Sequence, residues 1–226
     1  MEDKMSANTV FPGIIGFIEV VCGGMFSGKS EAVSAIISRH KHSKTRDVVT
    51  FSPILARRTI QCEDGTLVDT TGKQASRCGS SHDAIEVSEK NPYQIIDIIQ
   101  EFLATGRKVT TVIIEEGHFF SSELVSVCTT LAEEFQMHVV VGGLDQDFFG
   151  RPFGPMPALM AEAEFIHKEH AVCDECGSLV ASKSWLDTRE MSKADGNVLV
   201  GDRHYMALCR HCRRLYVEKY GLPKVP

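Results

Sequence analysis

The stretch Gly16-Phe-Ile-Glu-Val-Val-Cys-Gly-Gly-Met-Phe-Ser-Gly-Lys-Ser30 decides the fold of this chain. Its first part, residues 16–22, is mostly apolar and rich in β-formers, which is typical of a buried central strand. Its second part, residues 23–30, has the glycine, lysine and serine spacing of a phosphate-binding P-loop. Apolar residues at helical spacing follow in 31–42. The motif therefore stands where a P-loop requires it, between a strand and a helix.

This loop offers the groups that bind a nucleotide's phosphates. Glycines let backbone N–H groups wrap the phosphates, and the N-terminus of the helix adds partial positive charge. Lys29 is expected to reach the β- and γ-phosphates, and the Ser30 hydroxyl is suited to Mg²⁺. The alternative is a glycine-rich turn with a chance Lys-Ser pair, which the flanking strand and helix disfavour. The predicted phosphate-binding residues are Gly23, Gly24, Met25, Phe26, Ser27, Gly28, Lys29 and Ser30.

Strands and helices alternate beyond the loop. We expect strands at 47–51, 110–114 and 138–141 and helices at 92–103 and 123–135, whereas polar residues 56–82 lack a clear period and are expected to form a flexible surface loop. Strands that alternate with helices of roughly 10–15 residues favour a parallel sheet with helices on both faces. The predicted fold class is therefore α/β, a P-loop parallel sheet flanked by helices.

Four of the eight cysteines form two Cys-x-x-Cys pairs, Cys173/Cys176 and Cys209/Cys212. Without an export signal the thiols are expected to stay reduced, which disfavours disulfides. Four thiolates in two such pairs are typical ligands of structural zinc and leave no open coordination position. The alternatives are an iron–sulfur site or unliganded cysteines. We expect a P-loop nucleotide-binding domain over residues 1–168 and a small, ribbon-like zinc-binding domain over 169–226.

Composition excludes several classes of protein. Hydrophobic residues are 43% of the 226 residues and charged residues 24%, which excludes a disordered chain, a collagen or a coiled coil. No stretch approaches the ~20 continuous apolar residues of a membrane span, and acidic Glu2-Asp3 stands where a signal peptide is basic. The net charge of −6 disfavours long nucleic acid as a partner. We expect a cytoplasmic protein with no membrane or nucleic-acid partner.

Two carboxylates, Glu115 and Glu116, end the strand expected at 110–114. Neighbouring strand residues point to opposite faces, so the two are expected to have separate roles. In P-loop proteins an acid here holds Mg²⁺, usually through water, and a second carboxylate can accept a proton from a substrate hydroxyl. The alternative is a solvated acidic turn. The pair Phe119-Phe120 that follows is equally consistent with core packing and with stacking on a ring.

The histidines, nine in all, show no spacing typical of metal ligands. His211 lies between two cysteines and is expected near the metal or at the surface. The others that we place at the surface are His40, His42, His167 and His170.

Together these residues resemble the type II, zinc-containing thymidine kinases over about residues 16–213. Four landmarks carry the resemblance in the family's order: the loop 23–30, Glu116-Gly-His-Phe-Phe120, Gly143-Leu-Asp-x-Asp-Phe-x-Gly-x-Pro-Phe-Gly-Pro-Met-Pro157, and the cysteine knuckles Ala171-Val-Cys-x-x-Cys-Gly177 and Tyr205-x-x-x-Cys-Arg-x-Cys212. The third landmark is long, and the four together are far more specific than the P-loop alone.

The resemblance implies a kinase that transfers the γ-phosphoryl group of ATP to the 5′-hydroxyl of thymidine or deoxyuridine in nucleotide salvage. It implies that Glu116 is the general base, that Ser30 and Glu115 serve Mg²⁺, and that Arg58 joins the phosphate-binding set. It also implies structural zinc, a homotetramer, inhibition by the end-product triphosphate, and a lasso loop between Cys176 and Cys209 that covers the base. The implied nucleoside pocket consists of Met25, Phe119, Leu144, Phe148, Phe153, Val198, Gly201 and Tyr205.

Several positions depart from the family pattern. Glu115 stands for an aspartate, His118 for a glutamine and Lys183 for a small hydroxyl residue, while Ala56-Arg57 replaces an Asp-Asp or Asp-Thr pair and Gly201 a pair of glycines. Lys183 either alters base preference or swings to solvent, and the second is favoured. An active kinase is the leading hypothesis. The alternatives are a degenerate kinase-like domain that binds nucleotide as a scaffold, and a P-loop ATPase whose zinc module binds nucleic acid, which the acidic net charge disfavours.

Overall fold

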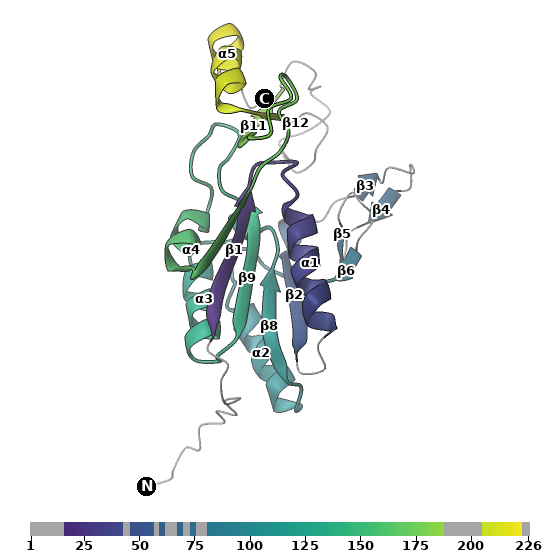
Figure 1. Ribbon diagram of the computed structural model, residues 1–226. Helices are drawn as coiled ribbons and strands as arrows, with labels where there is room; N and C mark the ends of the chain where they lie inside the picture. The colour runs from purple at the N-terminus through teal and green to yellow at the C-terminus, as the bar shows by residue number, and fades with distance from the viewer. Residues whose placement is uncertain are drawn as a thin grey trace.

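A six-stranded sheet with the strand order β10-β1-β9-β8-β2-β7 forms the centre of the protein (Figure 1). The computed structural model describes residues 16–42, 46–56, 59–61, 67–69, 73–75, 81–187 and 205–222. Every strand pair in this sheet is parallel, which confirms the predicted fold class. The strands are β1 (Phe17–Gly23), β2 (Asp47–Pro53), β7 (Ile85–Val87), β8 (Val109–Ile114), β9 (His138–Leu144) and β10 (Phe165–Glu169).

Helices cover both faces of the sheet, as the alternation of elements predicts. Helix α1 (Lys29–Lys41) covers one face, where Val33, Ile36 and Ile37 pack on β1, β8 and β9. The opposite face carries α2 (Gln94–Ala104), α3 (Leu124–Glu133) and α4 (Met156–Glu162), which enclose the larger hydrophobic core (Figure 1). All six residues of β8 are buried, because helices exclude water from both of its faces.

Four short strands lie in the polar region that the sequence predicts to be a loop. The 3-10 turn η1 (Ile54–Ala56) precedes two antiparallel pairs, β3 (Thr59–Gln61) with β4 (Leu67–Asp69) and β5 (Lys73–Ala75) with β6 (Ser81–Asp83). The expectation of a loop over this whole region was therefore wrong. Strands of three residues are too short to produce a readable alternation of apolar and polar side chains.

Two strands of the main sheet, β7 and β10, were also not predicted from the sequence. β7 has only three residues, and β10 is an edge strand whose side chains are mostly exposed, so neither forms the apolar run of a buried strand. β2 extends to Pro53, beyond the end predicted at residue 51, because Pro53 remains in register with Val87 of β7. Its missing N–H removes one donor but leaves the carbonyl available for pairing.

The C-terminal part has its own small core. The antiparallel pair β11 (Lys183–Leu186) and β12 (Tyr205–Leu208) precedes α5 (Arg210–Tyr220), and three of the paired cysteines, Cys173, Cys209 and Cys212, pack with Trp185 and its neighbours. The predicted domain boundary near Lys168 falls inside β10, whose last residue, Glu169, is in register with Gly23. That division stays a prediction. Within the described ranges, no helix combines the length and apolarity needed to cross a membrane.

Replacing Leu131 by Ala tests the larger core. Leu131 in α3 is 0% exposed, so the truncation leaves a cavity and is expected to lower the free energy of unfolding by about 2–5 kcal/mol. Leu103→Ala in α2 is the matched control, because that side chain is 38% exposed and its truncation should cost less than about 1 kcal/mol. Urea denaturation followed by circular dichroism measures both. Equal losses in the two variants would contradict this packing.

Candidate active site and metal centre

The predicted phosphate and acid residues come together at one edge of the sheet. The P-loop follows β1, Glu115 and Glu116 follow β8, and Leu144 ends β9. Because β9 lies between β1 and β8 and all three are parallel, their carboxyl ends share the same edge. Ligands of open α/β sheets bind in the crevice outside these ends.

The backbone of the loop adopts conformations that favour phosphate binding. Gly28 precedes α1 in the left-handed region, with φ of 84°, which glycine reaches without the steric cost of a Cβ. Phe26 also has positive φ, 63°, a conformation that is rare for a large side chain and typical of functional loops. The Lys29 Nζ reaches back across the loop and donates to the Gly24 carbonyl at 2.6 Å. The lysine therefore lies inside the loop that its motif predicts.

Acidic groups surround Lys29. Burial lowers the pKa of Lys29, whereas the charges of Glu116, Asp145 and Glu115 raise it. Asp145 is itself buried and its Oδ2 accepts from Lys168 Nζ at 2.6 Å, while its Oδ1 has no hydrogen-bond partner in the described part of the chain. A buried carboxylate oxygen of this kind is costly unless a ligand or ion satisfies it. Asp145 was not among the predicted site residues, although it stands inside the third landmark.

The side chain of Glu115 fits beside β9 because the facing residue of that strand, Gly142, has no side chain. Glu115 is 4% exposed, and a Cβ built on Gly142 of β9 would lie 2.9 Å from its Oε2 and 3.3 Å from Val33 Cγ2 of α1. The carboxylate therefore occupies the space between β9 and α1 that Gly142 leaves open. This explains how the site accommodates the longer side chain at a position where the family carries aspartate.

Glu116 has a strained backbone and a histidine beside it. Its φ of 50° and ψ of 41° are left-handed, which costs free energy in a non-glycine residue and is typical of active sites. Its Oε2 lies 3.7 Å from Nδ1 of the buried His118. That nitrogen accepts the Leu144 N–H at 3.1 Å, so the imidazole is neutral and carries its proton on Nε2. Strand alternation does not govern Glu116, because β8 ends at Ile114.

Aromatic side chains gather beside Glu116. The ring centroids of Phe119 and Phe153 are 6.1 Å apart in a T-shaped arrangement, and His118 lies 4.1 Å from Phe119 and 4.6 Å from Phe153. Phe120 is 3% exposed in the main core, so the two members of the aromatic pair have different environments. Phe148 and Tyr205 form a second contact, with centroids 6.3 Å apart. Predicted residues Arg58, Val198 and Gly201 lie outside the described residues.

Strand β11 of the C-terminal part touches the P-loop. Met25 N donates to Ser184 Oγ at 3.0 Å, a contact between distant segments that no local pattern predicts. Lys183 precedes Ser184, is partly buried and donates from Nζ to Gln146 Oε1 at 2.5 Å. The expectation that Lys183 swings to solvent was therefore wrong. Burial and the nearby Arg210 lower its pKa.

The histidines are not all at the surface. His42, His170 and His211 are exposed as expected, and His167 is exposed but lies beside Glu19. His40 is partly buried, with its Nδ1 2.9 Å from Thr111 Oγ1, so its placement at the surface was wrong.

The two cysteine pairs meet in a geometry that suits a metal ion. The four sulfurs of Cys173, Cys176, Cys209 and Cys212 all lie within 4.8 Å of one another, and Cys176 Sγ is 3.8 Å from Cys209 Sγ. Sulfurs bound at ~2.3 Å in a tetrahedron are about 3.8 Å apart, so the donors fit a tetrahedral thiophilic ion. Burial raises the pKa of Cys173, but backbone N–H groups, with Cys209 first, outweigh it and lower that pKa to about 7. The four cysteines are thus placed to hold a metal ion.

The fold and its Gly-Lys-Ser loop define a P-loop α/β protein with a four-cysteine module. The family profile described as thymidine kinase matches residues 16–213. Similar proteins include the thymidine kinases of Bacteroides fragilis (37% identical over 198 residues, 87% of this chain and 86% of that protein) and Mycoplasma genitalium (36% over 206 residues, 91% and 86%). A third is that of Bdellovibrio bacteriovorus (37% over 200 residues, 86% and 84%). The chain belongs to the thymidine kinase family and is an enzyme of that family.

Replacing Cys209 by Ser tests the metal centre. The purified protein is expected to hold about one thiophilic ion per chain, and the variant is expected to lose it because oxygen replaces one sulfur of a closed tetrahedral site. Cys128→Ala is the matched control, since Cys128 is buried in the main core, outside the four-cysteine cluster. Elemental analysis after desalting measures the metal content. Full occupancy in Cys209→Ser would rule out this ligand set.

Proposed function

We propose that this enzyme transfers the γ-phosphoryl group of ATP to the 5′-hydroxyl of thymidine and of deoxyuridine, as a cytoplasmic kinase of nucleotide salvage. Proteins of the thymidine kinase family act on a nucleoside and a nucleoside triphosphate, and this chain matches the family profile over residues 16–213. The proposal extends the family assignment to a particular reaction, a pair of acceptors and named residues.

The observation that carries the proposal is the position of Glu116. It follows β8 at the same sheet edge at which the P-loop follows β1. Of the acidic groups whose charges raise the pKa of Lys29, Glu116 has the largest effect. A base beside the phosphate-binding lysine is close to both reactants of a phosphoryl transfer. Its left-handed backbone is a conformation that non-glycine residues adopt mainly at functional sites, which favours a positioned catalytic group over a solvated acidic turn.

In this mechanism the loop 23–30 holds the triphosphate and Lys29 contacts the β- and γ-phosphates. Lys29 then releases the Gly24 carbonyl, to which it donates at 2.6 Å. Glu116 accepts the proton of the 5′-hydroxyl as that oxygen bonds to the γ-phosphorus and the bond from phosphorus to the leaving ADP oxygen breaks. Positioning and electrostatic stabilisation supply most of the rate in such transfers.

Oxygen donors at this edge suit Mg²⁺. Ser30 is the second residue of α1, and Glu115 lies between α1 and β9 against Gly142, so a hydroxyl-bearing residue and a carboxylate stand at the same end of the sheet. Hydroxyl, carboxylate and phosphate oxygens are the ligands that Mg²⁺ prefers. When bound, this ion neutralises charge on the phosphates. The proposal assigns Ser30 and Glu115 to it, and assigns Arg58 to the phosphates.

The deoxynucleoside is proposed to lie against the aromatic residues beside Glu116. Phe119 and Phe153 already form an edge-to-face pair that exposes ring surface, and Leu144 is tied to His118 through its N–H. Neutral His118 keeps a positive charge away from the base. The remaining proposed wall consists of Met25, Phe148, Val198, Gly201 and Tyr205.

Zinc is the ion that we propose for the four cysteines, with a structural role. The chain between the two cysteine pairs, residues 177–208, forms the loop that this ion would clip. The strands β11 and β12 at its two ends are paired. Because Ser184 of β11 accepts the Met25 N–H, the clipped loop is anchored on the P-loop. This anchoring supports a base-covering role for the loop. The resemblance to type II enzymes further supports a homotetramer and inhibition by the end-product triphosphate.

Replacing Glu116 by Gln tests the reaction and its base together. Phosphoryl transfer from Mg·ATP to thymidine and deoxyuridine is expected in the native enzyme, and the variant is expected to lose roughly 10²–10⁴-fold in kcat, the usual contribution of a general base. Nucleoside affinity should change little, because the amide keeps the size of the carboxylate. Radiolabelled phosphate transfer measures kcat and KM.

Glu162→Gln is the matched control, since Glu162 is exposed at the end of α4. Normal turnover in Glu116→Gln would show that another group accepts the proton. No turnover on thymidine, deoxyuridine, deoxycytidine or deoxyguanosine, in native protein that holds its metal and binds nucleotide, would instead identify a degenerate kinase domain.

A further inference from the structure

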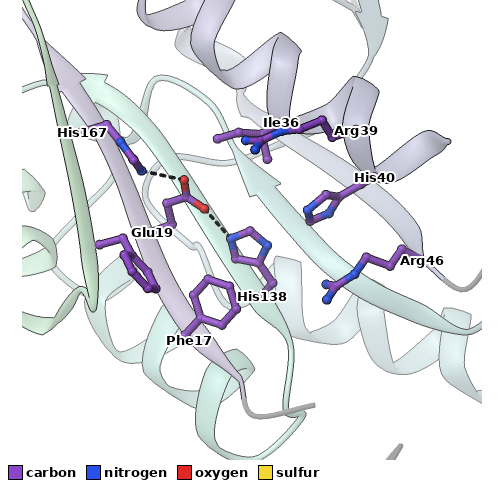
Figure 2. Close-up of a pocket in the computed structure, with 9 residues that line it drawn as sticks. Phe17, Glu19, Ile36, Arg39, His40, Arg46, His138 and His167 are labelled. Atoms are coloured by element: carbon purple, nitrogen blue, oxygen red, sulfur yellow. Dashed lines mark hydrogen bonds and ion pairs between the residues drawn. The ribbon is translucent and has the colours of Figure 1, made fainter. Parts of the chain in front are cut away.

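A second pocket lies at the opposite end of the sheet from the P-loop. It has a volume of about 370 Å³ and opens between α1 and the strands β1, β9 and β10 (Figure 2). Phe17 and His138, the first residues of β1 and β9, line it, so it stands at the amino ends of these strands. Phe17, Glu19, Ile36, Arg39, His40, Arg46, His138, Phe165 and His167 line the pocket. None of the roles proposed above uses these residues.

Basic side chains converge on this pocket from several elements. Arg39 and His40 come from the last turn of α1, Arg46 precedes β2, and His138 begins β9 (Figure 2). Among the described lining residues, Glu19 is the single carboxylate. The two arginines therefore leave the lining with a net positive charge even when every histidine is neutral.

Two buried donors or acceptors in the lining have no protein partner in the described part of the chain. They are Arg46 Nη1 and His138 Nδ1, and His138 is only 4% exposed. Buried polar atoms are normally satisfied, and an orphaned guanidinium nitrogen is especially costly. A bound anion would accept a hydrogen bond from Arg46 Nη1, the unpartnered guanidinium nitrogen.

Glu19 contacts two of the histidines, and its single negative charge does not neutralise both arginines of the lining. Its Oε2 lies 2.8 Å from His138 Nε2 and its Oε1 2.8 Å from His167 Nε2 (Figure 2). Its pKa is lowered, first of all by the hydrogen bond from His138, so it is ionised. Because Glu19 Oε2 is bound to His138 Nε2, Nδ1 is the ring nitrogen left to interact with a ligand. Glu19 thus fixes the orientation of the His138 ring in the pocket.

We propose that this pocket is a binding site for a small phosphate-bearing anion, separate from the nucleotide site. Donors that approach from α1, β9 and the start of β2 surround a tetrahedral group better than a planar carboxylate, which one arginine satisfies. A cation is disfavoured, because Arg39 and Arg46 leave the lining with a net positive charge. The volume accepts a phosphate ester or a diphosphate.

Binding at this site is expected to strengthen as the pH falls. The groups that face His40 are Arg39 on its own helix, Arg46, His138, Thr111, Glu19 and, beyond Glu19, His167. Burial and the charges of His138, Arg46 and Arg39 lower the pKa of His40 to about 4. A bound dianion offsets those positive charges and raises the pKa, so binding takes up a proton. Affinity for a dianion of fixed charge must then be higher at lower pH.

The first test is titration of the full chain with pyrophosphate by calorimetry. A Lys29→Ala background removes binding at the P-loop, and this variant is expected to retain one pyrophosphate per chain. Adding Arg46→Gln is expected to weaken that binding by about ten- to hundredfold, the worth of a charged hydrogen bond. Arg214→Gln is the control, because Arg214 is an exposed arginine of α5. Loss of binding in Lys29→Ala alone, or unchanged affinity in Arg46→Gln, overturns the proposal.

Arg39→Gln provides the same test without risk to the fold, since Arg39 is exposed. It decides the matter where Arg46→Gln fails to fold as judged by circular dichroism, and it is expected to weaken pyrophosphate binding at least severalfold. Parallel titrations with orthophosphate and ribose 5-phosphate distinguish a site for the free anion from one for a phosphorylated organic molecule.

The pH arm uses sulfate, whose charge is constant over the range measured. In the Lys29→Ala background, sulfate is expected to bind several times more tightly at pH 6 than at pH 8, and His40→Gln is expected to reduce that difference. Imidazole ¹⁵N shifts identify which ring gains the proton. Sulfate affinity that is the same at both pH values would contradict the part assigned to the histidines.

Discussion

The arrangement of the active-site edge depends on two adjacent glycines, Gly142 and Gly143, near the end of β9. A Cβ on Gly142 would lie 2.9 Å from Glu115 Oε2, and one on Gly143 would lie 2.7 Å from Met156 Sδ and 3.3 Å from the His118 backbone nitrogen. Real Cβ atoms essentially never lie within 3.0 Å of such an atom, and 3.3 Å is tighter than most real contacts. The first glycine therefore makes room for the carboxylate on the α1 side, and the second lets η2 (Gly117–Phe119) and α4 pack on the other side.

These contacts connect the acidic residues to the aromatic ones. Because Leu144, the next residue of β9, donates to His118 Nδ1, the strand end that accommodates Glu115 also fixes the ring beside Glu116 and Phe153. A side chain at Gly142 would displace the Glu115 carboxylate, and one at Gly143 would displace the Met156 side chain. The absence of a side chain at Gly142 thus decides where the Glu115 carboxylate lies, while the Leu144 N–H positions the His118 ring beside Glu116.

The sequence predicted the parts of the structure that repeat a local pattern. The P-loop, the buried strands β1, β8 and β9 and the cysteine pairs all combine a readable spacing with burial on both sides or with paired ligands. The short strands β3 to β6 and the exposed edge strand β10 carry no such pattern and were missed. The first and third landmarks also contain most of the residues now found at the carboxyl edge.

Contacts between segments that are distant in the sequence could not be predicted from local patterns. Lys183 looked like a solvent-facing residue because its environment is set by Gln146, which lies in another loop. The contact between Met25 and Ser184 and the ion pair of Asp145 with Lys168 likewise join residues far apart in the sequence. The family comparison identifies the landmarks, but only the folded chain shows which side chains fill the space around them.

Helix α1 connects the two ends of the sheet, and its electrostatics suit an anion at both. Its first residues, Lys29 and Ser30, stand at the N-terminus, where the macrodipole attracts phosphate. Its last turn carries Arg39, His40 and Lys41, which the negative end of the dipole stabilises. Two of these basic residues also line the second pocket. The dipole offsets part of the cost of clustering positive charge there, so one helix supports the P-loop through its backbone and the proposed anion site through its side chains.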